Sequence, residues 1–492
     1  MSCLIAAPCS GSGKTLLSLC LAALERRRGR TLQLFKVGPD YLDPQLLGAV
    51  SGRPCRNLDP LLCGEEWVRR CFHHHGSRAD AALVEGVMGL FDGRGPGSEG
   101  SSAAVAALLD LPVVLVVEAS RQAGSLAALV RGFRDHGPPA VRLAGVVLNR
   151  VGSPRHRALL AEALEAIAVP LLGVLPGDPA LELPSRHLGL LPPGELADLG
   201  QRQRQWADLA CQHLDLERFE PLLTPPPPLA GPAGADPVRW CLAQATEAGE
   251  EALESAAARP PLVIAVARDA AFHFRYPETA ELLRAVGFEP RHWSPLADQP
   301  LPPDCRAVLI PGGYPELHAA QLASSRRSLD ALTAAAQAGM PLVAECGGLL
   351  LLGAWLEDGR GLLQPMAGVL PFTARRGDLS LGYRTAEALS DGLLLRRGER
   401  LVGHEFHRWQ LQPHVAAGPR LWQLEGWGSA RRDEGWTTAS VHASWLHLHW
   451  AGCPEIPWRL SGSAARVAPL PMSAVSCSPR PRPRHPSGSA GA

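Results

Sequence analysis

The sequence predicts an α/β protein with two large domains, each built around a parallel sheet. Short, uniformly apolar runs alternate with helix-like stretches in both halves of the chain, which is the pattern of strands that helices cover on both faces. The chain of 492 residues is too long for one hydrophobic core. A proline-rich segment, "TPPPPLAGPAGADP" at 224–237, separates the two series of runs. Proline fixes φ and lacks a backbone donor, so neither a helix nor a sheet should cross this segment.

The apolar runs of the first half predict a doubly wound sheet. They read "CLIAAP", "TLQLFKVG", "AALVEGV", "PVVLVVEAS", "LAGVVLN" and "PLLGVLP". A second series follows with "PLVIAVARD", "AVLIPGG" and "MPLVAECGG". We therefore expect one α/β domain at 1–195, a helical and proline-rich linker at 196–258, a second α/β domain at 259–456 and a flexible tail at 457–492.

Composition argues against several classes of function. Lys+Arg and Asp+Glu are equal at 48 each, so no overall field would recruit nucleic acid. The 12 cysteines form no C-x-x-C pair, which argues against a zinc ribbon and a secreted disulfide framework. No run of 18 apolar residues and no signal-like N-terminus is present. We expect a cytoplasmic protein that interacts with neither membrane nor nucleic acid.

The N-terminal segment "LIAAPCSGSGKTLLSLCLAAL" predicts a strand, a loop of small residues and a helix. In such a phosphate-binding loop, backbone N–H groups face the anion, lysine adds a positive charge and a threonine hydroxyl can bind Mg²⁺. The usual first glycine is replaced by Pro8, so the loop is a deviant version of the pattern. The residues expected to bind ATP are Gly11, Ser12, Gly13, Lys14 and Thr15.

Acidic residues follow two of the predicted strands. "KVGPDYLDP" carries Asp40 and Asp43, and "VEGVMGLFDG" carries Glu85 and Asp92. A single acidic residue there is more often a cap or a turn former, but the carboxyl ends of parallel strands converge on one crevice. The cluster therefore favours a site for Mg²⁺ and a phosphoryl acceptor. Asn149 ends another predicted strand, where its amide could read a nucleotide base.

One cysteine lies between an apolar run and two glycines in "VAECGGLLLL". Cys346 could be an ordinary core residue, because free cysteine is often buried. On a sharp turn from strand to helix, however, the helix N-terminus would lower the thiol pKa and backbone N–H groups would stabilise an oxyanion. Gly347 leaves room for a substrate, and Gly312 and Gly313 in "LIPGGYPE" could supply a second oxyanion donor.

A base for this thiol is expected in "SVHASWLHLHW". If the segment is a strand, alternation puts His447 and His449 on one face. One could deprotonate Cys346 while the other orients it. The alternative is a core or metal-binding histidine pair, for which His404 and His407 would have to supply further ligands.

A phosphate site and a reactive thiol in one chain fit a single chemistry. ATP would convert a carboxylate into an acyl phosphate, and the thiol would attack the side-chain amide of glutamine to release ammonia. The product would be an amide. A P-loop ATPase switch, whose second half only binds a partner, is the alternative from a different class.

With these motifs in order, the chain closely resembles the cobyrinic acid a,c-diamide synthase family of glutamine-dependent ligases. The resemblance covers about residues 3–455 and includes "SGRPCRNLDP", "GVVLNRVGSPRHR", "SRHLGLLPPGE", "IAVARDAAFHFRYPE", "GHEFHRW" and "HASWLHLHW". It implies a dethiobiotin synthetase-like first domain and a triad-type glutamine amidotransferase as the second. The implied substrates are cobyrinic acid, ATP and glutamine, with Mg²⁺ as the cofactor, and the chain could form a homodimer.

The resemblance also assigns residues. It implies Thr15, Asp40 and Glu85 as metal ligands, and Cys346 as the nucleophile that His447 activates. The residues implied to orient the substrate carboxylate and its phosphorylated intermediate are Asp40, Tyr41, Leu42, Asp43 and Asp92.

Two departures from the family pattern leave questions open. Leu46 and Leu47 stand where many relatives carry an aromatic residue and a histidine, which puts a substrate contact from that turn in doubt. His449 stands where ordinary triad amidotransferases have glutamate, so the third triad member is undetermined. Hydrogenobyrinic acid and nickel sirohydrochlorin remain alternative substrates. A cobyric acid synthase would have different substrate motifs.

Overall fold

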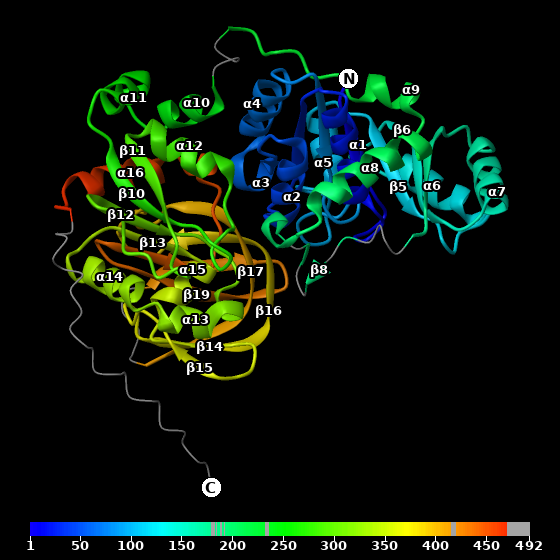
Figure 1. Ribbon diagram of the computed structural model, residues 1–492. Coiled ribbons are helices and arrows are strands. Elements are labelled where there is room, and N and C mark those ends of the chain that lie inside the picture. Colours follow the sequence, from blue (N-terminus) through cyan, green and yellow to red (C-terminus); the bar gives the residue numbers. More distant parts are fainter. Residues whose placement is uncertain are drawn as a thin grey trace. The chain divides into compact units, whose positions relative to one another are not determined.

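The computed structural model describes residues 1–178, 183, 185–186, 189–190, 192–231, 236–414 and 420–469. The chain divides into two compact units, the first ending at Trp240 and the second beginning at Cys241 (Figure 1). Each unit contains its own extended sheet. Residues 470–492, most of the predicted tail, lie outside the described residues, as does 232–235 of the proline-rich segment.

The first unit contains a seven-stranded sheet in the order β3-β2-β4-β1-β5-β6-β7. All of its strand pairs are parallel, which confirms the predicted class. Its strands are β1 (Cys3–Ala6), β2 (Leu32–Val37), β3 (Arg56–Leu58), β4 (Ala81–Glu85), β5 (Val113–Glu118), β6 (Leu143–Val151) and β7 (Leu171–Pro176). A two-stranded sheet pairs β8 (Ser185–Arg186) with β9 (Gly189–Leu190).

Helices cover both faces of this sheet (Figure 1). They are α1 (Lys14–Arg27), α2 (Leu42–Ser51), α3 (Pro60–Cys63), α4 (Glu65–Gly76), α5 (Ser102–Leu108), α6 (Ser125–Asp135), α7 (Pro154–Glu165), α8 (Leu199–His213) and α9 (Leu216–Phe219). One core joins side chains of α1, α2 and α8 to alternate residues of the strands, such as Leu34. Phe35 points to the other face, where its ring lies 5.2 Å from that of Phe72 on α4. Burial on both faces explains why the strands lack polar alternation.

Helix α8 differs from the prediction, which assigned it to a linker. Trp206, Ala207 and Ala210 on this helix are buried in the core that contains α1. Phe219 and Leu223 farther along the chain belong to the same core. The polar outer face of the helix is the reason why the sequence predicted a linker. Its apolar stripe, however, packs into the core of the first unit.

The second unit contains an 11-stranded mixed sheet. Strands β11, β10, β12, β13 and β20 form a parallel part in that order, and most of the remaining pairs are antiparallel. The strands are β10 (Leu262–Ala267), β11 (Phe288–Trp293), β12 (Cys305–Ile310), β13 (Leu342–Glu345), β14 (Trp355–Glu357), β15 (Leu363–Pro365), β16 (Phe372–Ala388), β17 (Arg400–Pro413), β18 (Arg420–Gly426), β19 (Ser429–Thr437) and β20 (Val441–Ser444).

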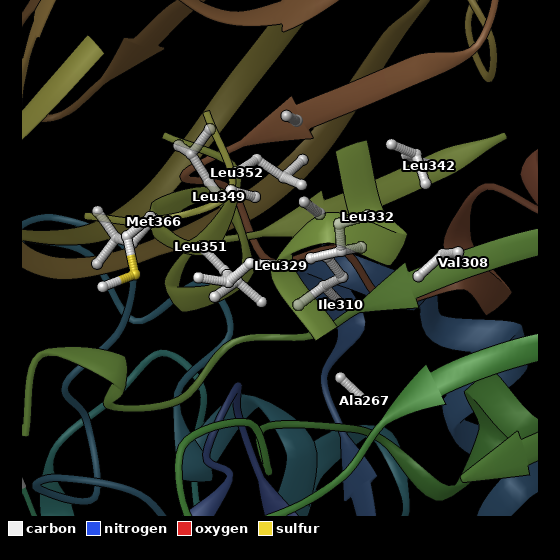
Figure 2. Close-up of a cluster of buried hydrophobic side chains, with 14 of the residues drawn as sticks. Ala267, Val308, Ile310, Leu329, Leu332, Leu342, Leu349, Leu351, Leu352 and Met366 are labelled. Carbon is white, nitrogen blue, oxygen red and sulfur yellow. The ribbon is translucent and has the colours of Figure 1, made fainter. Parts of the chain in front are cut away.

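The helices that flank this sheet pack into one core. Figure 2 shows part of it, with Leu349, Leu351 and Leu352 of α15 beside Ile310 and Met366. The helices are α11 (Gly249–Ala257), α12 (Pro277–Ala285), α13 (Ala319–Ser324), α14 (Arg326–Gln337), α15 (Gly347–Leu352) and α16 (Glu455–Ala465), and α10 (Pro237–Gln244) spans the division between the units. This core anchors the short helix that follows Cys346.

Two boundaries in the second unit differ from the prediction. Helix α16 continues to Ala465, with Leu460 and Ala464 buried, so the predicted tail cannot begin at 457. Strand β20 ends at Ser444, before both predicted active-site histidines. No helix in the described part of the chain is long and apolar enough to span a membrane.

Candidate active site

The predicted phosphate loop forms a sharp turn into α1. Gly13 precedes the helix with φ 112° and Gly11 has φ 81°, values that glycine adopts readily and other residues avoid. A Cβ on Gly13 would lie 2.3 Å from Nδ2 of Asn149. The amide of Asn149 donates to the carbonyl of Ser12 at 3.0 Å. Asn149 therefore supports the loop, and its predicted contact with a base stays a prediction.

Lys14 is buried beside the loop and binds backbone carbonyls. Its Nζ donates to the carbonyl of Met88 at 2.5 Å and to that of Cys9 at 3.4 Å. Burial, followed by the nearby charge of Lys36, lowers the pKa of Lys14 to about 8. Asp92 closes the adjacent turn, since its carboxylate accepts the N–H of Gly89 at 2.8 Å.

Thr15 and Glu85 meet at the carboxyl edge of the sheet. The Thr15 hydroxyl donates to Oε1 of Glu85 at 2.9 Å. Within the described residues, Oε2 of Glu85 is buried and has no hydrogen-bond partner. A hydroxyl next to an unsatisfied carboxylate oxygen suits Mg²⁺, which takes one or two protein oxygens together with phosphates and water. These two residues therefore fit a nucleotide-bound magnesium ion.

Lys36 is a central residue of this site that the sequence analysis did not single out. Its Nζ lies 2.7 Å from both Asp43 and Glu85 and 3.9 Å from Asp40. Burial opposes its charge, but the three carboxylates outweigh burial and raise the pKa of Lys36 well above its ordinary value. The available signal in the sequence was a lysine within the mostly apolar run "LQLFKV".

The "GPDYLDP" motif after β2 provides carboxylates to the site and also stabilises the start of α2. Oδ1 of Asp40 accepts the N–H groups of Leu42 and Asp43, at 2.9 and 3.1 Å, and so supports the first turn of α2. Burial and the Asp43 carboxylate raise the pKa of Asp40 to about 7. Tyr41 and Leu42 are mostly buried, so their predicted contact with substrate stays a prediction.

The two leucines that depart from the family pattern have a structural role. Leu46 and Leu47 are almost completely buried on α2 and belong to the core shared with α1 and α8. In the same segment, the carboxylates of Asp40 and Asp43 lie 3.9 and 2.7 Å from Nζ of Lys36.

In the second unit, Cys346 occupies the predicted sharp turn between β13 and α15. Its φ is 48° and its ψ is −107°, a strained combination for a residue other than glycine. The backbone N–H of Cys346 donates to the carbonyl of Ser444 at 2.7 Å. Its thiol donates to the carbonyl of Phe406 on β17 at 3.6 Å.

The predicted lowering of the Cys346 pKa is wrong for this structure. The side chain is only 4 % exposed. Burial, followed by the Glu316 carboxylate, raises the pKa of the thiol far above its ordinary value. The helix N-terminus does not offset this effect, since α15 has only six residues. A reaction at this sulfur therefore needs a base that takes the proton as the bond forms.

The glycine turn lies against both the cysteine turn and His447. A Cβ on Gly347 would lie 2.9 Å from the backbone nitrogen of Gly313, and one on Gly312 would lie 2.4 Å from Cε1 of His447. The glycines thus allow a close approach that larger residues would prevent. The backbone nitrogen of Gly313 therefore lies close to Gly347, and the predicted oxyanion role of these glycines stays a prediction.

The two histidines follow β20 rather than lying within it. His447 exchanges backbone hydrogen bonds with His404 on β17, at 2.9 and 3.0 Å. Burial, and then the neighbouring His404 and His407, lower the pKa of His447 to about 3, so its ring is neutral at pH 7. The ring of His447 lies 6.1 Å from that of Phe274, and the ring of His449 lies 4.4 Å from that of Tyr276.

The metal alternative for these histidines gains no support. No group of three or more His, Cys, Asp or Glu side chains suited to a metal ion occurs among the residues that the structure describes. His407 instead contacts Glu405 at 3.0 Å and stacks on Trp445 with ring centroids 3.8 Å apart. Glu405 also accepts a 2.8 Å hydrogen bond from Arg384, and this network braces the strand whose Phe406 carbonyl contacts the thiol.

Comparison with known proteins identifies both units. Residues 3–191 match the CobQ/CobB/MinD/ParA nucleotide binding domain, and residues 263–454 match the CobB/CobQ-like glutamine amidotransferase domain. A cobyrinate a,c-diamide synthase of Gloeobacter violaceus is 44% identical over 92% of this chain and 94% of its own length. The chain belongs to the cobyrinate a,c-diamide synthase family.

Other members of the cobyrinate a,c-diamide synthase family are nearly as similar. The enzyme of that name from Synechocystis is 42% identical over 92% of this chain and 90% of its own length. A hydrogenobyrinate a,c-diamide synthase of Streptomyces coelicolor is 42% identical over 92% of this chain and 96% of its own length. Family membership confirms the resemblance and the two-part architecture predicted from the sequence.

Proposed function

We propose that this protein is an ATP- and glutamine-dependent ligase that converts the a and c carboxylates of cobyrinic acid into amides in cobalamin biosynthesis. The observation that carries this proposal is the presence in one chain of a phosphate loop with carboxylates and of a strained cysteine turn that lies, like a neutral histidine, against one glycine turn. Relatives that are 41–44% identical over 92% of the chain carry the name cobyrinate a,c-diamide synthase.

In the second unit, Cys346 is the proposed nucleophile for glutamine hydrolysis. Its sulfur attacks the side-chain amide carbon while His447 takes the thiol proton and passes it to the leaving ammonia. The N–H groups of Gly313 and Gly347 stabilise the oxyanion. Water then releases glutamate. A neutral imidazole suits this role, because a protonated ring could not accept the proton.

In the first unit, the phosphate loop positions the γ-phosphoryl group for attack by a substrate carboxylate. The carboxylate takes the phosphoryl group and ADP leaves; ammonia then displaces phosphate and leaves the amide. Thr15 and Glu85 would hold Mg²⁺, which offsets the phosphate charge. Lys36 holds Asp43 and Glu85 in place through its ion pairs with both carboxylates.

Hydrogenobyrinic acid is the second candidate substrate, because relatives with that name are also about 42% identical. The two macrocycles differ at their centre and share the carboxylates that react. A cytoplasmic location and a homodimeric assembly stay predictions from the sequence.

Mass spectrometry of the purified protein tests the proposal directly. The protein is supplied with Mg-ATP, glutamine and either cobyrinic acid, hydrogenobyrinic acid or nickel sirohydrochlorin. We expect two carboxyl groups of cobyrinic acid to become amides. Faster diamide formation from another macrocycle would reassign the substrate, and the absence of amide from all three would refute the ligase.

Asp43→Asn tests the substrate side separately. Loss of this carboxylate removes a partner of Lys36 at 2.7 Å but leaves the second unit unchanged. We expect glutamine hydrolysis to persist while diamide formation falls steeply. Normal diamide yield from this variant would exclude a substrate role for Asp43.

A further inference from the structure

The segment after β10 has no role in the chemistry proposed so far. It reads "RDAAFHFRYPE", residues 268–278. The structure places it along the active-site turn, since the N–H groups of His273 and Phe274 both donate to the carbonyl of Gly312, at 3.1 and 3.0 Å. Phe274 then faces His447 and Tyr276 faces His449. The segment therefore lines the histidine side of the site.

Glu278 ends this segment in the first turn of α12 and approaches His449. Its Oε2 lies 3.7 Å from Nε2 of that histidine, and both residues are only 1 % exposed. On the other side of the ring, Nδ1 of His449 accepts the N–H of Ala451 at 3.3 Å. Because one ring nitrogen accepts, the other carries the proton in the neutral ring. The Nε2–H of His449 is therefore directed toward the Glu278 carboxylate.

This arrangement bears on the missing acidic member of the triad. In such triads the acid orients the imidazole and stabilises the positive charge that appears when the imidazole takes the nucleophile's proton. Here the position two residues after His447 is His449, which cannot supply a negative charge itself. We propose that Glu278 orients the ring of His449 and so fixes the short chain segment that carries His447, which makes Glu278 a positioning residue for glutamine hydrolysis.

A second buried carboxylate lies near the same segment but faces different groups. Glu345 accepts a hydrogen bond from the indole Nε1 of Trp450 at 3.3 Å and another from the backbone of Leu448. Burial raises the pKa of Glu345 to about 8. Glu345 thus tethers the chain on which the histidines lie, whereas Glu278 faces an imidazole ring.

The inference rests on the proposed glutaminase role of Cys346 and His447, and kinetics of the full-length protein can separate the two. Glu278→Gln keeps the size of the side chain and removes its charge. Glu281→Gln, one turn along the same helix and only partly buried, is the control. His449→Gln interrupts the connection without touching Glu278.

We expect Glu278→Gln to lower kcat for glutamine hydrolysis about tenfold, a part of the roughly 10²- to 10⁴-fold that general acid–base catalysis contributes. KM for glutamine and amide formation from added ammonia should match the wild type, because neither uses the histidines. His449→Gln should give a similar loss, and the double variant should be no worse than either single one. Glu281→Gln should behave as the wild type.

An unchanged kcat in Glu278→Gln would overturn the inference, as would fully additive losses in the double variant. A loss of ammonia-dependent amidation as well would indicate a structural role instead. If Glu278→Gln does not fold, normal glutamine hydrolysis by His449→Gln would refute the connection. Wild-type protein without any glutaminase activity would refute the proposed function itself, which is a distinct outcome.

Discussion

Lys36 in the first unit lies 2.7 Å from two carboxylates. In the second unit, Cys346 donates to a neutral carbonyl, and the ring of His447 is neutral. The first site is a set of buried charges that compensate one another. In the second site, burial suppresses charge on both the Cys346 thiol and the His447 imidazole, the proposed base. Phosphoryl transfer needs fixed charges around phosphate, while thiol attack needs a proton acceptor at the moment of reaction. The difference therefore follows the chemistry that each unit performs.

The largest effects are expected from substitutions at two glycines, each of which should disable one site and leave the other intact. A Cβ on Gly13 would meet Asn149 at 2.3 Å, and one on Gly312 would meet His447 at 2.4 Å. Since misplacing a reactive group by about 1 Å can cost about 10²-fold, Gly13→Ala should abolish nucleotide binding and spare glutamine hydrolysis. Gly312→Ala should abolish glutamine hydrolysis and spare nucleotide binding. Binding of a fluorescent ATP analogue and release of glutamate measure the two activities.

Matched controls exist in each unit. Gly124 and Gly359 have nothing within 4 Å of an added Cβ and no left-handed φ, so their alanine variants should retain both activities. If Gly312→Ala also lost nucleotide binding, or Gly13→Ala lost glutamine hydrolysis, the two sites would not be separable in this way.

Lys36→Met tests whether the charges of the first unit are mutually compensated. The substitution leaves Glu85 and Asp43 without their cation, and breaking a buried ion pair costs about 3–5 kcal/mol. Adding Glu85→Gln should restore part of that stability. Urea unfolding followed by circular dichroism measures the free energy of unfolding.

Asp208→Ala is the control, since it removes an exposed ion pair with Arg27 and should cost at most about 1 kcal/mol. Equal losses of stability from Lys36→Met and Asp208→Ala would contradict the mutual compensation of the buried charges.

The stability of the second unit should depend on pH. Burial lowers the pKa of His404 to about 4, and those of His442 and His447 to about 3, whereas in the unfolded chain each titrates near 6.5. Below about pH 6.5 the unfolded state therefore binds more protons, and stability falls as pH falls toward 4. Each group contributes up to about 1.4 kcal/mol per pH unit in this range.

His442→Gln removes one of these groups at a position that the proposed chemistry does not use. The variant should show a shallower decline of the unfolding temperature between pH 7 and pH 5 than the wild type, as measured by scanning calorimetry. An identical slope in both proteins would mean that His442 is not held neutral by burial.

The parallel strands of both units could be predicted from the sequence because continuous apolar runs mark burial on two faces. The long strands β16 and β17 could not, since "FTARRGDLSLGYRTAEA" has no sustained apolar period. The cysteine turn was predicted from its glycines. Its raised pKa was not, because burial depends on packing from distant segments.

Contacts between residues far apart in the sequence also limit what can be predicted for individual site residues. Lys36 meets Glu85, and His449 meets Glu278, only after the sheets form. A lysine inside an apolar strand and a motif without an assigned role were the visible signals. Neither signal identifies a partner, because side-chain pairing in space depends on topology rather than on local pattern.

The most direct test of the account compares glutamine with ammonia as the nitrogen source in Cys346→Ser. With Mg-ATP and cobyrinic acid, we expect glutamine-dependent diamide formation to fall by at least about 10³-fold while ammonia-dependent formation stays near the wild-type rate. Undiminished glutamine-dependent amidation in this variant would contradict the central claim. That claim is that Cys346 releases ammonia from glutamine and that this ammonia forms the amide at the ATP-dependent site.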